Sequence, residues 1–268
     1  EQYAMVSQGI SADLIASVEG FTREECDALG VDSQIRAQEA ISQGRFERSL
    51  VPIFHDDGTL ALDHDEFPRP GTTIADLAKL SPSFEGMGAY VPKGQDLSLD
   101  QTALLAYPQV GKINHVHHAG NSSGVVDGAA ALLFASSDYA KAHGLSARAR
   151  VVATANMGDD PTLMLNAPVP AAKKVLEKAG LKTDDIDVWE INEAFSVVAE
   201  TFIRDLDLDR EKVNINGGAM ALGHPIGATG SILIGTALDE LERSGGRYGL
   251  VTMCAAGGMA PAIIIERI

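Results

Sequence analysis

The stretch NGGAMALGHPIGATG (residues 216–230) places one histidine, His224, among five glycines, and an apolar run with helical spacing follows it. Glycine has no side chain, so the backbone here can pass close to another surface or to a ligand. Taken alone, the pattern fits two interpretations. It is either a tight turn between a strand and a helix with an incidental histidine, or an imidazole held beside a bound ligand.

The chain as a whole has the composition of an ordinary globular protein. Its 268 residues, 45% hydrophobic and 22% charged, suit one large domain or two smaller ones. The formal net charge of −16 argues against nucleic acid or an anionic membrane as the main partner. A small anionic ligand remains compatible, because a few local donors or a helix N-terminus can hold it.

Features that report on the compartment point to the cytoplasm. Two cysteines, Cys26 and Cys254, are too few for a disulfide framework and fit a reducing environment. No apolar run approaches the roughly 18 residues of a membrane span, and the opening EQYAMVSQGI lacks the pattern of a signal peptide. The opening also lacks an initiator methionine, which we interpret as a hint that a further segment precedes it.

The first 120 residues predict a helical layer rich in loops rather than a regular sheet. Apolar spacing in SADLIASV (11–18) and the capping box TREE (22–25) each predict a helix. Between Phe84 and Ala119 scattered proline and glycine interrupt any period, so this excursion is expected to hold one short helix. Shorter elements are expected elsewhere: a strand over 49–54, a hairpin within 55–73 and a helix over 74–80.

Beyond residue 120, strands and helices alternate, which predicts an α/β layered sheet. The last two strands are joined by so short a link that they must form an antiparallel hairpin. The predicted elements are a buried helix over 127–144, a strand over 148–158, a helix over 169–180, a strand over 186–191, a helix over 194–206, a strand over 213–217, a helix over 226–245 and two strands within 247–268.

Three polar side chains stand at the ends of predicted strands: Asn192, His224 and Cys254. Each has an ordinary explanation, since Asn192 could be a helix N-cap, His224 an incidental turn residue and Cys254 a buried core thiol. Together they suggest more, because ligands of open α/β sheets bind where strands end. An amide, an imidazole and a thiol that converge there supply an oxyanion donor and a base.

Five stretches of the chain together resemble the thiolase family, and the resemblance covers nearly the whole sequence. The glycine–histidine block 216–230 is the most specific of them. The others are PRPGTTIADLAKLSPSF (68–84), AGNSSGVVDGAA (119–130), NEAF (192–195) and CAAGGMAPAIIIER (254–267).

The resemblance implies a thiolase-like layered α/β fold with two parts. Residues 1–120 match the family's loop domain, which lies over coenzyme A, and residues 121–268 match its C-terminal domain, a βαβαβαββ unit. Thiolases cleave or form a 3-ketoacyl-CoA by a Claisen step through an acyl-cysteine. The implied ligands are acyl-CoA and coenzyme A, with no redox cofactor and no metal.

The resemblance also assigns roles to residues at the strand ends. His224 matches the histidine that activates the nucleophilic cysteine and helps to stabilise the enolate oxygen of the thioester. Cys254 matches the acid/base cysteine, and Asn192 matches the asparagine that holds a water in the enolate oxyanion hole. The backbone N–H of Ala256 matches part of a second oxyanion hole.

Two further positions, Ser123 and Phe84, match residues that line the tunnel for the pantetheine of coenzyme A. The chain departs from the family at two places. Ala255 and Ala256 stand where the family has a glycine run after the cysteine, and Ser7 and Gln8 replace its HMG-type opening.

The family's nucleophilic cysteine belongs to an N-terminal half that this sequence does not contain. Cys26 is expected to be no substitute, because it lies at a helix start in an acidic setting, interpreted as exposed, that disfavours the thiolate. The three histidines of HVHH (115–118) raise a metal site as an alternative to a surface or pocket-lining role.

Several functional alternatives follow. The chain is expected to be part of a homodimer or homotetramer, as thiolases are, or a subunit of a β-oxidation complex. An alternative is a non-catalytic relative that binds acyl-CoA. The missing nucleophile favours this alternative, and the presence of Asn192, His224 and Cys254 argues against it. A condensing relative with a Cys-His-His set is opposed by Cys254, where such relatives would have a histidine.

Overall fold

A computed structural model describes residues 3–268, and its centre is a four-stranded mixed sheet. The strand order is β3–β6–β5–β4, in which β4 runs parallel to β5 and the other two pairs are antiparallel. The strands are β3 (Ala149–Gly158), β4 (Val188–Ile191), β5 (Tyr248–Thr252) and β6 (Met259–Arg267). The predicted final hairpin is confirmed as the β5–β6 pair.

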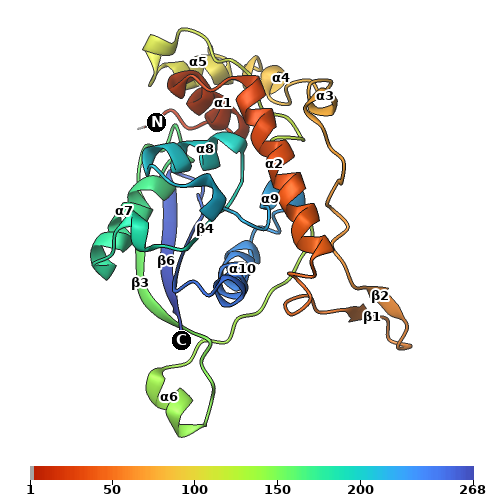
Figure 1. The fold of residues 1–268 in the computed structure, drawn as a ribbon. Helices are drawn as coiled ribbons and strands as arrows, with labels where there is room; N and C mark the ends of the chain where they lie inside the picture. The colour runs from red at the N-terminus through yellow and green to blue at the C-terminus, as the bar shows by residue number, and fades with distance from the viewer. Residues whose placement is uncertain (1–2) are drawn as a thin grey trace.

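Helices cover both faces of this sheet, as Figure 1 shows. Neighbouring residues of a strand point to opposite faces. On β4, Trp189 packs into the main core with α7 and α8, whereas Val188 packs against α10. The same alternation separates Leu250 from Val251 on β5. These three helices were predicted from the sequence and are confirmed as α7 (Pro168–Ala179), α8 (Ser196–Asp205) and α10 (Thr229–Ser244).

Two N-terminal helices, α1 (Gln8–Glu19) and α2 (Arg23–Ser42), pack against α8. The predicted capping box is present at the start of α2, where Glu25 N donates to Thr22 Oγ1 and Thr22 N donates to Glu25 Oε2. The helix α2 runs past α8 and the short helix α9 (Ala219–Leu222), which belongs to the glycine–histidine block (Figure 1).

The loop-rich part of the chain contains more short elements than the sequence indicated. The predicted hairpin exists, and the excursion after Phe84 holds two α-helices and a 3-10 turn instead of one helix. No helix in residues 3–268 combines the length and the apolar character that crossing a membrane requires. The short elements are β1 (Ile53–Phe54), β2 (Leu60–Leu62), α3 (Ile74–Leu77), α4 (Glu85–Gly88), α5 (Leu99–Leu104), η1 (Pro108–Val110), α6 (Ser137–Ala142), η2 (Thr183–Asp185) and η3 (Arg210–Lys212).

The structure differs from the sequence-based expectation over residues 127–144. The predicted buried helix is wrong: residues 127–136 form neither helix nor strand, and only α6 is helical. Leu133 is 88% exposed and Phe134 60% exposed. A run of alanine and leucine favours a helix locally. A short helix is stable, however, only when one of its faces packs against other residues, and most of this stretch is exposed within residues 3–268. The strand predicted over 213–217 is reduced to one bridge between Val213 and Trp189.

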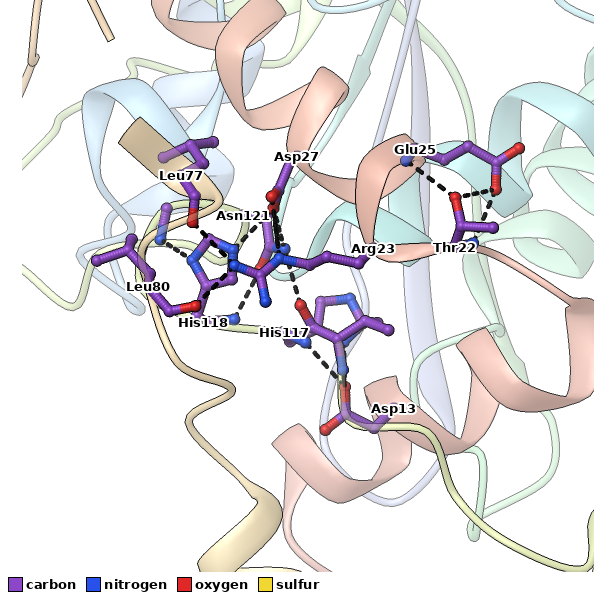
Figure 2. A network of polar contacts seen from close by, with 12 residues as sticks. Asp13, Thr22, Arg23, Glu25, Asp27, Leu77, Leu80, His117, His118 and Asn121 are labelled. Carbon is purple, nitrogen blue, oxygen red and sulfur yellow. Dashed lines mark hydrogen bonds and ion pairs between the residues drawn. The ribbon is translucent and has the colours of Figure 1, made fainter. Parts of the chain in front are cut away.

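Buried hydrogen bonds to two carboxylates fasten the segment 113–121 to α1 and α2 (Figure 2). Asp13 on α1 is fully buried, and its Oδ1 accepts from Val116 N, His117 N and His117 Nδ1. On α2, Asp27 Oδ1 accepts from His118 Nε2 at 2.7 Å and from the Asn121 amide at 2.8 Å. The two carboxylates therefore fix the backbone that leads into residues 122–125.

A third histidine, His115, connects the excursion to the same network. Its Nδ1 lies 2.7 Å from Asp13 Oδ2, and its Nε2 lies 3.0 Å from Asp100 Oδ2 on α5. Only the imidazolium has two N–H donors, so these contacts favour the charged ring. The hydrogen bond to Asp13 is the largest cause that raises the pKa of His115 above its usual value.

We predict that the stability supplied by His115 depends on pH. Because its folded-state pKa is raised, the contribution is fully present below the unfolded value and is lost as pH rises through the folded value. His115→Asn should lower the free energy of unfolding by about 1 to 3 kcal/mol at about pH 6, and by much less at about pH 9. Urea unfolding across this range measures the difference.

A matched control is His55→Asn, which changes an exposed histidine next to β1 and should leave the unfolding free energy unaltered at every pH. If the wild-type and His115→Asn curves stay parallel from about pH 6 to about pH 9, the ring is not held as a cation.

Candidate active site at the ends of β4 and β5

Two of the predicted site residues lie together because β4 and β5 are parallel neighbours. Ile191 and Thr252, the last residues of the two strands, are paired in register. Asn192 continues this pairing, since its N–H donates to Thr252 O at 3.1 Å. Cys254 follows two residues later, so the amide and the thiol leave the sheet at the same edge.

Asn192 is buried, and its side chain has no hydrogen-bond partner. Neither its Oδ1 nor its Nδ2 contacts another polar group of residues 3–268. The interpretation of Asn192 as a helix N-cap is wrong, because α8 begins at Ser196 and its N-cap position is Phe195. A buried amide without partners costs free energy, and such a group is suited to hold a water or a ligand atom.

Cys254 is also buried, and burial raises the pKa of its thiol to about 12. The turn that follows is closed by paired hydrogen bonds between Ala255 and Met259. Gly258 has a φ of 78°, and a side chain there would meet the carbonyl oxygens of Asp159 and Asp160 at 2.8 Å. The turn thus needs a glycine at this position. Ala256 stands exposed within it.

The segment 122–125 brings the histidine block to the same edge. Ser123 N donates to Ala194 O at 3.0 Å, which ties this segment to NEAF. At the next residue, Gly124, the carbonyl oxygen accepts from His224 N at 2.7 Å. The start of α10 completes the connection, because the Cβ position of Gly230 lies 3.8 Å from the sulfur of Met253, the neighbour of Cys254. All three predicted catalytic residues therefore belong to contacting segments.

The ring of His224 has one hydrogen-bond partner in the described part of the chain. Its Nδ1 lies 2.7 Å from Thr229 Oγ1. Burial lowers the pKa of His224 below its usual value, so the imidazole is neutral at neutral pH and can accept a proton. With a protonated thiol at Cys254, the edge of the sheet holds a base, an acid and an unpaired amide.

Glu193, the second residue of NEAF, fixes these segments from behind. Its buried carboxylate accepts from Ser33 Oγ on α2 at 2.7 Å, from Asn214 Nδ2 at 2.9 Å and from Met220 N at 3.2 Å. A side chain at Gly218 would overlap this carboxylate. Burial raises the pKa of Glu193, although the three donors favour its ionised form.

Phe84 lies at the rim of the site. Its ring meets Phe195 of NEAF edge to face, with 5.9 Å between the ring centroids. A side chain at Gly9 would overlap the Phe84 ring, so α1 passes directly beneath it. Figure 1 shows α5 next to α1, on the side of α1 that faces away from the sheet. Phe84 and Ser123 both contact NEAF, which connects the two residues predicted to line a tunnel.

Sequence reasoning missed Thr229, Glu193 and Phe67 as parts of this region. A side chain at Gly124 would overlap the Phe67 ring, and the Arg69 guanidinium lies 5.7 Å from that ring. The signals were present, since all of these residues fall inside or beside the quoted motifs. Nothing in their spacing shows that they touch one another, because the contacts join distant segments.

The structure also corrects two details. Cys26 is not exposed as expected but fully buried, and burial, aided by Asp27, raises the pKa of its thiol to about 12. The surface role considered for HVHH is wrong for His117 and His118, which are both buried. Hydrogen bonds to carboxylates occupy the three histidines instead.

Comparisons with known proteins match both parts of the chain. The family model described as thiolase, N-terminal domain, matches residues 1–94, and the one described as thiolase, C-terminal domain, matches residues 145–267. An acetyl-CoA acetyltransferase of Syntrophomonas wolfei subsp. wolfei is 41% identical over 262 residues, covering 96% of this chain and 59% of that protein. A beta-ketoadipyl-CoA thiolase of Pseudomonas aeruginosa is 40% identical over 272 residues, covering 100% of this chain and 61% of its own length.

Solved structures agree with the sequence comparisons. The crystal structure of human mitochondrial 3-ketoacyl-CoA thiolase matches with a TM-score of 0.83 and 37% identity, covering 97% of this chain and 59% of that chain. The same protein in complex with CoA gives a TM-score of 0.83. The chain thus spans about six tenths of the length of these relatives. Its motifs, its fold and these matches agree, and the chain belongs to the thiolase family.

Proposed function

We propose that this chain supplies the acid–base part of a thiolase active site, in an acyl-CoA C-acyltransferase that cleaves or forms 3-ketoacyl-CoA. The observation that carries this proposal is the set of contacting segments that hold Asn192, His224 and Cys254 at one edge of the sheet. Relatives named acetyl-CoA acetyltransferase and 3-ketoacyl-CoA thiolase support the reaction class.

The chemistry follows from the protonation state of each group. His224 is neutral, so it accepts the proton of the nucleophilic thiol and then presents an N–H to the enolate oxygen. Cys254 begins protonated, so it donates a proton to the leaving group or carbanion and takes one back in the reverse step. The unpaired amide of Asn192 holds a water that donates to the same oxygen.

Coenzyme A binds, in this proposal, along the rim formed by Phe84 and Ser123, with the N–H of Ala256 facing the thioester oxygen. The solved complex of the human mitochondrial enzyme with CoA supports this class of ligand. The excursion from Gly86 to Ile113 packs on α1 beside this rim, which makes it the candidate element for shaping the acyl site. The coenzyme A thioesters are the substrates, and the mechanism requires no redox cofactor or metal.

The nucleophilic cysteine of the cycle comes, we propose, from outside these 268 residues. Burial raises the pKa of both Cys26 and Cys254 to about 12, so neither thiol ionises near neutral pH, and nucleophilic attack needs a thiolate. The exposed apolar residues Leu133 and Phe134 form a surface that the nucleophile-bearing part would cover. That part belongs to the same protein or to a second polypeptide.

We also propose a domain boundary, a cellular location and an assembly for the protein. The loop domain would end near residue 120, where the segment fixed by Asp27 enters the site, and the C-terminal domain would follow. The protein would work in the cytoplasm as a homodimer or homotetramer, with membership of a β-oxidation complex as the alternative. The rival function, non-catalytic binding of acyl-CoA, is disfavoured because the unpaired Asn192 amide and the neutral His224 ring serve no purpose in packing.

We predict that Cys254→Ser nearly abolishes turnover in the complete enzyme while coenzyme A binding stays largely intact. General acid–base catalysis is worth about 100-fold or more, and a serine hydroxyl is a far weaker acid than a thiol. Steady-state assays with acetoacetyl-CoA and calorimetric titration with coenzyme A measure the two effects. A folded variant that keeps more than about a tenth of the wild-type kcat would contradict the acid/base assignment.

A second prediction separates this chain from a complete enzyme. Incubated alone with acetyl-CoA, the 268-residue chain should gain no stoichiometric acetyl group, because its two thiols stay protonated. Intact-mass spectrometry makes the measurement. Acetylation of Cys26 or Cys254, together with turnover of ketoacyl-CoA, would show that the nucleophile lies in this chain.

A further inference from the structure

The hydroxyl of Thr229 is directed at the catalytic imidazole rather than at its own helix. Thr229 is the first residue of α10 and is only 2% exposed. A hydroxyl at a helix start commonly caps free backbone N–H groups, yet α10 has no side-chain cap. Instead Thr229 Oγ1 lies 2.7 Å from His224 Nδ1, its hydrogen-bond partner in the described chain.

The turn between the two residues is built to bring them together. Ile226 has a φ of 32°, an unfavourable value for a β-branched residue, which persists only where the surroundings impose it. Gly223 has a φ of 91°, and a side chain there would meet Val126 at 2.6 Å. The backbone on both sides of His224 is therefore constrained, and the Thr229 contact fixes the remaining freedom, the rotation of the ring.

The chemical nature of the partner matters as much as its position. In many hydrolases a carboxylate holds the equivalent nitrogen, which selects one tautomer and stabilises the imidazolium. A hydroxyl oxygen can accept the same N–H without adding a negative charge. No carboxylate contacts the His224 ring in residues 3–268, and burial lowers the pKa of the ring.

We propose that Thr229 is a positioning residue, a neutral tether whose hydroxyl oxygen accepts a hydrogen bond from the Nδ1–H of His224 and so directs the Nε2 lone pair into the site. This inference rests on the proposed function. In that cycle Nε2 takes the proton of the attacking thiol, and the sulfur keeps the electron pair and attacks the thioester. No bond to Thr229 forms or breaks. A neutral tether keeps the resulting imidazolium acidic enough to return its proton.

Three variants of Thr229 separate position from charge. Thr229→Ser keeps the hydroxyl and should retain kcat/KM within about twofold of wild type. Thr229→Val keeps the shape but loses the hydroxyl, and kcat should fall about tenfold with little change in KM. Thr229→Asp adds a charge that raises the pKa of His224, so the acid limb of the kcat/KM profile should move to higher pH.

A spectroscopic measurement on the 268-residue chain tests the tether without any turnover. Nitrogen-15 spectra of histidine-labelled protein distinguish the two neutral tautomers, and the seven histidines are resolved by comparison with His224→Gln. Wild type and Thr229→Ser should hold His224 as the Nδ1–H form, whereas Thr229→Val should show a mixture. If Thr229→Val fails to fold, Thr229→Ala takes its place.

The outcomes are distinguishable. A wild-type Nδ1–H tautomer that becomes mixed without the hydroxyl supports the tether, even if the complete protein proves unable to cleave or form 3-ketoacyl-CoA. An unchanged tautomer in Thr229→Val or Thr229→Ala overturns it, even if turnover is observed. If the acid limb of the kcat/KM profile does not move in Thr229→Asp, the claim that the charge of the partner sets the pKa of His224 is likewise overturned.

Discussion

One buried carboxylate, that of Glu193, connects NEAF to three other segments around the site. It directly follows Asn192 and accepts hydrogen bonds from Ser33 on α2, from Asn214 and from the backbone of Met220. These donors come from the helical N-terminal part, from the segment after α8 and from the glycine–histidine block. A buried charge that lost these donors would be costly, so the three segments stay in place together, and the loop-rich part of the chain becomes a structural requirement for the catalytic part.

Two buried asparagines near the end of β4 differ in whether the hydrogen bonds of their side chains are satisfied. Asn214, held at a φ of 48°, bonds both backbone groups of Ile191 as well as Glu193. Asn192, one residue beyond that strand, has an amide with no partner in residues 3–268. The bonded side chain of Asn214 thus holds the backbone of β4, whereas the unbonded amide of Asn192 is available for the chemistry that we propose.

The sequence predicts those parts of the fold whose signals are local. The helices α7 and α10 end at Gly180 and Gly245, both with positive φ, and short apolar runs between the helices identify β3 to β6. Residues 127–136 could not be predicted in the same way, because their apolar run fits a helix and the structure gives it no surface to pack on. The residues of the site were identified by motif, but the contact between His224 and Thr229 and the burial of Cys26 depend on distant packing. The spacing of residues along the sequence does not predict such contacts or such burial.

The most direct test of this account replaces Glu193 with glutamine and follows backbone hydrogen exchange by mass spectrometry. Glutamine keeps the shape but brings an N–H₂ group toward the donors of Ser33, Asn214 and Met220, so the account predicts faster exchange in α2, in 192–195 and in 213–224 together. The control Glu240→Gln, which alters a buried carboxylate bonded to Asn216 and Arg243, should leave 192–195 unchanged. Faster exchange confined to 192–195 in Glu193→Gln would contradict the claim that one carboxylate holds the site together.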